Sequence, residues 1–300
     1  MAKILITGGT VFASKYVAAY YVHKGDNVFV LNRNHHAQAD GVTLIEADRH
    51  NLGDALKGHH FDVVIDVTAY TADDIVDLLK GLGSFNDYIM ISSSAVYPEN
   101  SPRPFTEEQA VGENRFWGVY GMNKIAAEHA LFQAVPHAYV LRPPYLYGPM
   151  NNVYREAFVF DCALQKRRFY IPRDGQMGLQ FFHVKDLCRM IDRIVERKPQ
   201  NHIFNVGNED TISVRDWVTL CYEIAGIPLE IVNVYEDIEQ RNYFSFYNYD
   251  YKLDVTKQKE LLTDTIDLKE GLRESLLWYQ DHMEEVNKKD YLEYIDTHWK

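Results

Sequence analysis

The first forty residues constrain the fold of this chain most strongly. A short apolar run, Ile4-Leu5-Ile6, precedes a turn at Thr7-Gly8-Gly9-Thr10, and a mostly apolar stretch then extends from Val11 to His23. Gly25-Asp26-Asn27 interrupts that stretch before a second apolar run at 28–31. A strand, a glycine turn, a helix and a second strand form a βαβ unit. Glycine lets the backbone turn tightly and lets a pyrophosphate approach the free N–H groups that open the helix. The unit therefore predicts a dinucleotide at the carboxyl end of the first strand.

The same alternation of strands and helices continues along the chain. Further strands are expected at 42–46, 62–67, 88–92 and 138–141, with helices at 51–57, 72–82 and 119–132. This order predicts an α/β fold with a Rossmann-like, doubly wound parallel sheet. Past Gly148 the pattern becomes mixed, with helices expected at 154–166, 184–196, 213–225, 254–262 and 267–279 and a late strand at 203–206. We expect a dinucleotide-binding domain at 1–150, to which 179–206 returns, and a smaller mixed C-terminal substrate domain at 151–178 and 207–300.

Charge and cysteine content restrict the class of partner. The 43 acidic and 31 basic residues give a net charge of −12, which opposes the binding of nucleic acid. No basic run is longer than Lys166-Arg167-Arg168. We expect no membrane span, and the early first strand leaves no room for a signal peptide. Three scattered cysteines fit a reducing compartment, so the expected location is cytoplasmic.

Polar residues after the early strands indicate how the adenosine half of a cofactor would be held. Asn32 follows the second strand where a carboxylate would accept from the ribose hydroxyls, and Arg33 beside it can pair with a phosphate. This pair favours NADP slightly over NAD, the alternative being that Arg33 is an ordinary surface arginine. Asp48-Arg49 ends the third strand, where an aspartate can accept from the adenine amine.

The end of the fourth strand offers space and little chemistry. Val67-Thr68-Ala69 are small enough to leave room for the cofactor, and Asp66 before them is interpreted as a helix cap or a loop residue. The pairs His35-His36 and His59-His60 lie in polar loops without a third ligand, so no metal site is expected.

The candidate chemistry lies in two segments further along. Ser92-Ser93-Ser94 ends the fifth strand, and the next helix carries Tyr120 and Lys124, four residues apart and therefore on one face. An ammonium beside a phenol favours the phenolate and lowers its pKa from about 10, which would make Tyr120 a usable acid/base near neutral pH. A serine hydroxyl from the strand end can bind the same substrate oxygen.

With these pieces the chain resembles the extended short-chain dehydrogenases/reductases of the NAD-dependent epimerase/dehydratase family. The resemblance covers nearly the whole chain through Thr7-Gly8-Gly9, Ser92–Tyr97, Tyr120 with Lys124, Leu141–Pro149, Phe182–Leu187 and Asn205-Val206-Gly207. It implies that Ser93 and Tyr120 are catalytic, that Lys124 binds the nicotinamide ribose and tunes Tyr120, and that Pro143 and Tyr145 lie near the nicotinamide. The expected cofactor-binding residues are Thr7, Gly8, Gly9, Thr10, Val11, Phe12, Asn32, Arg33, Asp48, Arg49, Val67, Thr68, Ala69, Ser92, Tyr120, Lys124, Pro143 and Tyr145.

Several departures from the family pattern narrow the subclass. Val11 and Ser14 stand at the second and third glycines of the fingerprint, Ser94-Ala95 replaces the Asp-Glu of the dehydratases, and Leu179-Gln180 replaces the Arg-Asp of many epimerases. The chain is in this respect similar to an atypical branch that includes chloroplast stem-loop RNA-binding proteins and bacterial reductases. Arg241 is then the best remaining phosphate-binding candidate, and the aromatic stretch 243–251 is expected to form core or a pocket wall.

Together these features predict an NAD(P)-dependent oxidoreductase or epimerase acting at a hydroxyl or keto carbon of a small molecule such as a sugar nucleotide. An RNA-binding protein and a cofactor-sensing protein on the same fold are the alternatives. The resemblance also implies a homodimer that pairs through the helices at 72–82 and 119–132, with Leu78, Leu79 and Phe132 as apolar contacts.

Overall fold

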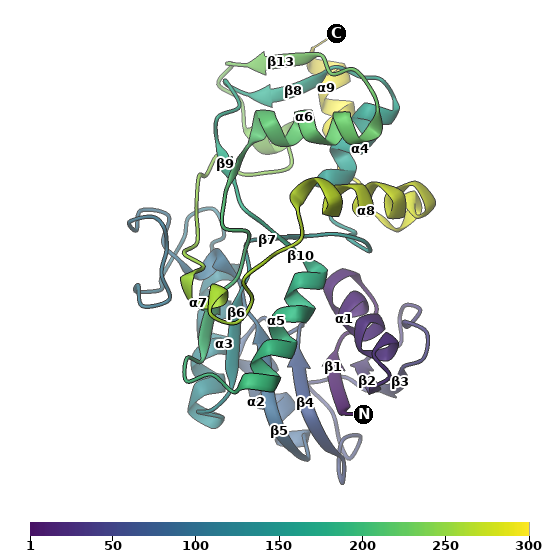
Figure 1. Ribbon diagram of the computed structural model, residues 1–300, viewed down its shortest axis with the longest axis vertical. Helices are drawn as coiled ribbons and strands as arrows, with labels where there is room; N and C mark the ends of the chain where they lie inside the picture. Colours follow the sequence, from purple (N-terminus) through teal and green to yellow (C-terminus); the bar gives the residue numbers. More distant parts are fainter. Residues whose placement is uncertain (300) are drawn as a thin grey trace.

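The computed structural model describes residues 1–299 and has two lobes stacked along its long axis (Figure 1). The lobe that carries the N-terminus is built on one seven-stranded sheet in the order β11-β6-β5-β4-β1-β2-β3. All six neighbouring pairs are parallel, and the strand order reverses between β1 and β4. The strands are β1 (Lys3–Thr7), β2 (Asn27–Asn32), β3 (Thr43–Glu46), β4 (His60–Asp66), β5 (Ser84–Ile91), β6 (Tyr139–Arg142) and β11 (Ile203–Asn205). The predicted doubly wound sheet is confirmed.

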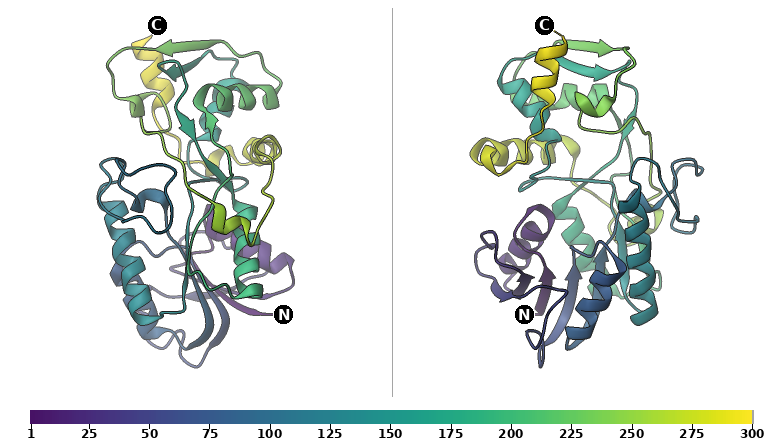
Figure 2. Two further views of the ribbon diagram at one scale, coloured as in Figure 1. Left: turned by 60° about the vertical axis from the view of Figure 1, so that its left-hand side comes forward. Right: turned by 180° about the vertical axis from the view of Figure 1, so that it is seen from behind.

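Helices cover both faces of this sheet because alternate strand residues are apolar on both sides. Ile4 and Ile6 of β1 pack with α1 (Phe12–His23) and α5 (Val184–Arg197), whereas Leu5 between them packs with the opposite layer. That second layer consists of α2 (Ala72–Gly81) and α3 (Val119–Ala134), which contact each other (Figure 2). The carboxyl ends of the strands face the second lobe and are not covered by either helical layer.

The second lobe is formed by the segments that follow β6 and β11, the last two strands of the seven-stranded sheet along the chain. Its short parallel pair joins β8 (Phe169–Pro172) to β13 (Ile231–Val234), and α4, α6 and α8 contact one another beside it (Figure 1). Its other elements are β7 (Tyr145–Tyr147), α4 (Glu156–Leu164), β9 (Gly178–Leu179), β10 (Phe181–His183), β12 (Ile212–Ser213), α6 (Val214–Ala225), α8 (Leu268–Asp281) and α9 (Tyr291–His298). The short helix α7 (Thr256–Lys259) contacts β11 of the first lobe. Segments β7 and β10 pair in parallel between the lobes.

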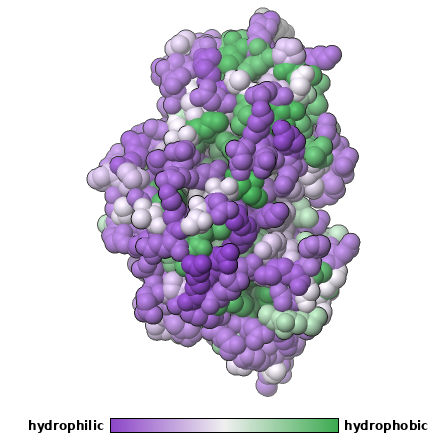
Figure 3. All heavy atoms as spheres, viewed as in Figure 1, coloured by the Kyte–Doolittle hydropathy of each residue, from purple (hydrophilic) through white to green (hydrophobic). Residues whose placement is uncertain are grey.

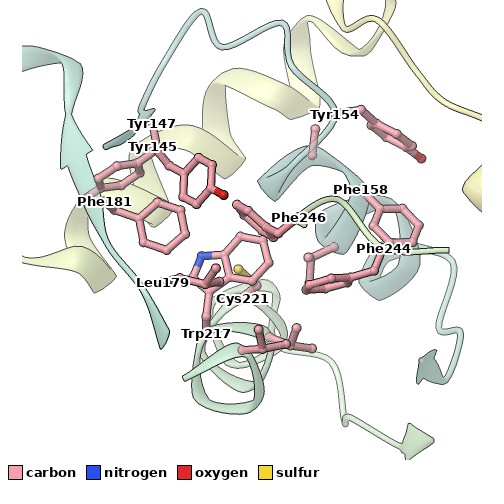
Figure 4. Packing of buried hydrophobic residues seen from close by; sticks show 14 of the residues in the cluster. Tyr145, Tyr147, Tyr154, Phe158, Leu179, Phe181, Trp217, Cys221, Phe244 and Phe246 are labelled. Carbon is pink, nitrogen blue, oxygen red and sulfur yellow. The ribbon is translucent and has the colours of Figure 1, made fainter. Parts of the chain in front are cut away.

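Aromatic side chains dominate the core of this lobe (Figure 4). Trp217 of α6 is fully buried, stacks on Phe181 with ring centroids 5.6 Å apart and meets Phe246 edge-on at 5.2 Å. Phe246 and Phe244 belong to the aromatic stretch 243–251 and are fully buried, whereas Tyr247 of the same stretch is only partly buried. Both parts of the expectation for this stretch are confirmed, since it supplies core residues and, as described below, one wall of a cavity.

Helix starts follow local sequence signals. Thr71 forms a capping box with Asp74 at the start of α2, and Ser213 accepts from the Asp216 N–H at the start of α6. His183 caps α5 by accepting from the Lys185 N–H.

Two expected helices differ in the structure. The segment 51–57 forms consecutive turns, because Gly53 and Gly58 take positive φ values of 53° and 76° and the backbone bonds span three residues. Its buried residues, Leu52 and Leu56, gave a helical spacing that turns also satisfy. The segment 254–262 is helical only at Thr256–Lys259.

The surface is mainly hydrophilic on the face shown in Figure 3, with hydrophobic patches on the second lobe and near the junction of the lobes. Within residues 1–299 no helix combines the length and apolarity that a membrane crossing requires. The same residues contain no cluster of three or more His, Cys, Asp or Glu side chains placed to hold a metal ion. Cys162, Cys188 and Cys221 are all free and buried.

Candidate functional site

The glycine turn after β1 has the shape that its sequence predicts. Gly8 and Gly9 take φ values of +88° and +87°, in the region that side-chain-bearing residues avoid. A Cβ on Gly9 would lie 2.5 Å from Cγ1 of Val30, so this position also brings the turn against β2. Val11 is the N-cap residue of α1 and is 38% exposed. Ser14 is buried, and its hydroxyl donates to the Val11 carbonyl at 2.9 Å. The two missing glycines thus do not prevent the turn from closing.

The expected adenosine residues meet around one cavity of about 350 Å³ at the carboxyl ends of β1 to β4. Arg33 is exposed there, and Asn32 donates its amide to the Gly8 carbonyl at 2.7 Å, tying the second strand to the turn. Thr10 and Phe12 follow the glycine turn but do not line the cavity. Val67 and Ala69 are the neighbours of Thr68 and do not line it either. The lining residues are Thr7, Gly8, Leu31, Asn32, Arg33, Ala47, Asp48, Arg49, His50, Thr68, Tyr70 and Asp74.

Asp66 lies beneath this cavity and is neither a helix cap nor a loop residue, which corrects the sequence interpretation. It is fully buried at the end of β4, and its carboxylate accepts from Tyr88 at 2.5 Å, Thr7 at 2.7 Å and Arg49 at 2.8 Å. Arg49 also approaches Asp74, with its Nε 3.6 Å from the carboxylate. A buried charge needs such partners, because desolvation would otherwise cost several kcal/mol.

Two hydroxyls from the expected cofactor set are already engaged within the protein. Thr7 Oγ1 donates to Asp66 and accepts from the backbone N–H groups of Val67 and Thr68. Ser92 is buried and donates to Glu128 at 2.5 Å. Glu128 in turn binds Arg142, with Nε–Oε1 and Nη2–Oε2 distances of 3.0 and 2.5 Å. These hydroxyls hold strand ends in place and are not free for a ligand in this structure.

Ser93 and Tyr120 line a second cavity, of about 450 Å³, between the two lobes. Trp117 and Tyr120 lie together there with ring centroids 6.3 Å apart, and Tyr145 forms the adjoining wall from β7. Pro143 is buried next to this wall, where its carbonyl accepts from the Ser94 N–H at 2.9 Å. The lining residues are Ser93, Trp117, Tyr120, Pro144, Tyr145, Asn152, Val153, Tyr154, Arg155, Arg241, Ser245, Phe246, Tyr247, Asn287, Lys289 and Tyr291.

The lining of this second cavity is positively charged. It includes the cationic side chains Arg155, Arg241 and Lys289 and no aspartate or glutamate. Arg155 lies over the Tyr145 ring at 5.2 Å, and Arg241 lies over the Tyr247 ring at 4.9 Å. No carboxylate of residues 1–299 lies within 4.0 Å of either guanidinium. In a chain whose net charge is −12, such a cavity is adapted to an anionic ligand.

Lys124 is on the same helix face as Tyr120, but its surroundings differ from the expectation. Its side chain is buried, and its ammonium donates to the carbonyls of Ala69 at 2.7 Å and Ile91 at 2.9 Å. Burial lowers the pKa of Lys124 to about 8, and the nearby carboxylates of Asp66 and Glu128 oppose that shift.

The pKa of Tyr120 is raised, contrary to the prediction that Lys124 would lower it. Burial of the phenol is the main cause, while the Ser93 hydroxyl and the charge of Arg155 act in the lowering direction. Lys124, whose ammonium donates to the two carbonyls, is not among the groups that shift it. The pair therefore has the expected helical spacing without the expected electrostatic coupling.

Sequence reasoning missed two residues that the structure brings to these cavities. Tyr70 is 50% exposed, lines the cavity at the carboxyl ends of β1 to β4, and has its ring centroid 6.4 Å from that of Tyr120. It directly follows the small residues that end β4, which is the signal that could have identified it. Arg155 comes from the loop after Gly148-Pro149. It lines the second cavity together with residues of 241–247, and no sequence pattern indicates that these two segments meet.

Comparison with known proteins agrees with this geometry. Residues 71–207 match the sequence model of the NAD dependent epimerase/dehydratase family. The chloroplast stem-loop binding protein of 41 kDa b from Arabidopsis thaliana is 27% identical over 91% of this chain and 78% of its own length.

Two solved structures share the fold over nearly their whole length. The UDP-glucose 4-epimerase of Thermotoga maritima has a TM-score of 0.76 at 20% identity, covering 93% of this chain and 99% of that one. The dTDP-glucose 4,6-dehydratase of Bacillus anthracis, solved with NAD, has a TM-score of 0.75 at 18% identity, covering 95% and 98%. The family match, the seven-stranded sheet and the glycine turn agree: residues 71–207 match the NAD-dependent epimerase/dehydratase family, and the chain has the fold of the extended short-chain dehydrogenases/reductases.

Proposed function

We propose that this enzyme is an NAD(P)-dependent oxidoreductase or epimerase that acts at a hydroxyl or keto carbon of a sugar nucleotide. One observation carries the proposal: Ser93 and Tyr120 face an anion-adapted cavity that adjoins a nucleotide cavity at the carboxyl end of the same sheet. A bound nicotinamide would take hydride from the reacting carbon or return it. The residues Gly8 and Gly9 fit such a cofactor, since side chains at either position would fill the turn.

Tyr120 is assigned the role of acid/base for the substrate hydroxyl. Its side chain is 38% exposed toward the cavity, and Ser93 lies beside it, so one substrate oxygen can meet both hydroxyls. A phenol with a raised pKa is protonated at neutral pH, which suits donation to a keto oxygen during reduction. Proton removal from an alcohol needs the phenolate and therefore a positive charge nearby, such as that of Arg155 or of Lys124 after its carbonyl contacts change.

Substrate class follows from charge. The relatives named above act on UDP-glucose and dTDP-glucose by their names, and a nucleotide diphosphate is an anion that Arg155, Arg241 and Lys289 would neutralise. Arg241 is the proposed diphosphate contact. Ser94-Ala95, in place of an acidic pair, supplies no groups to move protons at neighbouring carbons, so epimerisation or net redox is proposed rather than dehydration.

Calorimetry tests the cofactor and the substrate separately. Titrations with NAD, NADH, NADP and NADPH should show binding, with a small advantage for the phosphorylated pair because Arg33 is exposed at the adenosine cavity. Arg33→Gln should abolish that advantage and leave NAD binding unchanged. UDP-glucose and dTDP-glucose should bind with NAD present, and Arg241→Gln should weaken both. No binding of any of the four cofactors would refute the enzyme proposal.

We also propose a homodimer that pairs through α2 and α3. Val76 is 40% exposed and Met122 is 44% exposed on these helices, and they replace Leu78, which is fully buried in its own core and cannot serve as predicted. Leu79 and Phe132 are partly buried against the same core.

The division at 1–150 with 179–206 against the rest is kept as a proposal, as is a cytoplasmic location, which the three buried free cysteines favour.

RNA binding and cofactor sensing are less well supported. The basic run 166–168 lines an open cavity of about 840 Å³ at the far end of the second lobe, but Arg167 pairs with Asp296 and Arg168 lies 3.8 Å from Glu230. These acids reduce the positive field that a polyanion would require. A sensor would not need Ser93 and Tyr120 facing a substrate cavity.

A further inference from the structure

Lys124 is enclosed on the side that faces the two cavities. Its side chain is only 2% exposed, and the ring of Tyr70 lies over the ammonium, with 4.8 Å between Nζ and the ring centroid. The same Tyr70 lines the nucleotide cavity and approaches Tyr120, with 6.4 Å between the ring centroids. Tyr70 therefore lies where Lys124, Tyr120 and the nucleotide cavity come together.

Two of the three hydrogen-bond donors of Lys124 are used in this arrangement. An ammonium has three N–H donors and no acceptor. Two donors go to the Ala69 and Ile91 carbonyls at 2.7 and 2.9 Å, and the face of the Tyr70 ring attracts the remaining charge as a cation–π partner. The Tyr70 ring covers the ammonium, so a ribose hydroxyl has no open approach to the third donor while the ring stays in this position.

Tyr70 is free to move although its backbone is fixed. The backbone N–H of Tyr70 donates to Asp74 at 2.9 Å within the cap that starts α2, which anchors the main chain. Its side chain is 50% exposed, and its hydroxyl forms no hydrogen bond with residues 1–299. Rotation about the side-chain torsions would uncover Lys124 without disturbing α2.

We propose that the Tyr70 ring is a gate over Lys124, covering the ammonium at rest and moving aside when the ribose of a nucleotide takes its place. This inference rests on the proposed function, because the ribose belongs to the proposed cofactor. Tyr70 acts through Lys124 and is therefore a positioning residue.

Chemical labelling of Lys124 measures the cover directly. The wild-type protein without cofactor is acetylated with acetic anhydride over a range of pH, and the rate at Lys124 is followed by peptide mass spectrometry. Each profile gives a pKa and a limiting rate for the free amine, so exposure is separated from protonation. Tyr70→Ala should raise the limiting rate severalfold, because the ring no longer shields the amine from the reagent. It should also raise the pKa of Lys124 from about 8, because water reaches the ammonium.

Two control variants separate the gate from general loosening. Tyr70→Phe keeps the ring face and should label like the wild type. Tyr235→Ala removes a tyrosine that is 66% exposed on the second lobe and should leave Lys124 unchanged. Equal limiting rates in Tyr70→Ala and the wild type would overturn the proposal, as would equally fast labelling in Tyr70→Phe and Tyr70→Ala.

A kinetic measurement tests the movement itself. In stopped-flow fluorescence, NADH should associate faster with Tyr70→Ala than with the wild type, because no ring has to leave first, and Tyr70→Phe should resemble the wild type. Unchanged association after faster labelling would show a cover that is not a gate and would overturn the inference. Failure of NADH to bind the wild-type protein would overturn the proposed function as well, whereas a negative labelling result overturns the gate alone.

Discussion

Substitution of Gly9 tests whether the turn is held by conformation alone or also by close packing. Gly9 and Gly25 have nearly the same φ, +87° and +85°, so an alanine at either position bears the left-handed conformation. A Cβ at Gly25 would meet nothing within 4 Å, whereas at Gly9 it would lie 2.5 Å from Cγ1 and 2.8 Å from Cβ of Val30. Val30 is fully buried in β2 and has no space to withdraw. Gly25→Ala is therefore a matched control for Gly9→Ala.

The magnitudes follow from these two contributions. The left-handed conformation costs a residue with a Cβ about 1–2 kcal/mol, and this applies to both variants. Overpacking a rigid core adds about 1–3 kcal/mol at Gly9 only. The gain from a less flexible unfolded chain is common to both and cancels in the comparison. Gly9→Ala should thus lower the free energy of unfolding by about 1–3 kcal/mol more than Gly25→Ala.

Urea denaturation followed by far-ultraviolet circular dichroism gives both values, and calorimetry gives the dissociation constant for NAD. NAD binding should weaken in Gly9→Ala and stay unchanged in Gly25→Ala, because only the first displaces the turn. In the double variant, Val30→Ala should relieve part of the overpacking that Gly9→Ala introduces, so the double variant should be more stable than the sum of the two single losses predicts. The relief is only partial, because the substitution removes the nearer methyl group but leaves the Val30 Cβ. Equal destabilisation by the two glycine variants would refute the argument that β2 sets the position of the turn.

Three further predictions concern catalysis, pH and assembly. Tyr120→Phe should reduce turnover about a hundred- to ten-thousandfold, Ser93→Ala less, and Lys124→Met should also weaken cofactor binding; full activity in Tyr120→Phe under saturating cofactor would place the chemistry elsewhere. Burial lowers the pKa of His183 to about 4. Between about pH 6.5 and pH 4 the unfolded state therefore binds more protons than the folded state. The free energy of unfolding should fall by up to about 1.4 kcal/mol for each pH unit as the pH drops through that range. His183→Asn, which keeps a helix cap, should flatten that dependence in urea denaturation, and an unchanged slope would rule out His183 as its source. Light scattering should give twice the chain mass of 34.9 kDa, and Val76→Arg should yield monomers; a wild-type monomer at micromolar concentration would contradict the proposed dimer.

Much of the nucleotide-binding half could be predicted because its signals are local. A glycine turn between two apolar strands, a helix cap at His183 and polar residues at strand ends depend on neighbours within a few positions. The doubly wound order then follows from alternation, since parallel strands need helical crossovers. The same local logic failed at 51–57, where buried leucines four apart occur in turns as readily as in a helix.

The electrostatic state of the site depended on contacts between distant segments. The spacing of Tyr120 and Lys124 is a property of one helix and was correctly predicted. The direction of the Lys124 ammonium is decided by the carbonyls of Ala69 and Ile91 and by the Tyr70 ring, which come from the ends of two other strands. Asp66 was misread for a similar reason, since its partners Arg49 and Tyr88 lie 17 and 22 residues away.

The sequence by itself therefore determined the fold class, the glycine turn after the first strand and the residue types available for chemistry, because each is encoded in short-range pattern. Only the tertiary structure decided which charges those residues experience. Arg155 and Arg241 are 86 positions apart and form one cationic cavity without a carboxylate only because the chain after α6 returns over the sheet ends. Coulomb interaction and desolvation depend on distance in space and on burial, and neither quantity is written in the order of the residues.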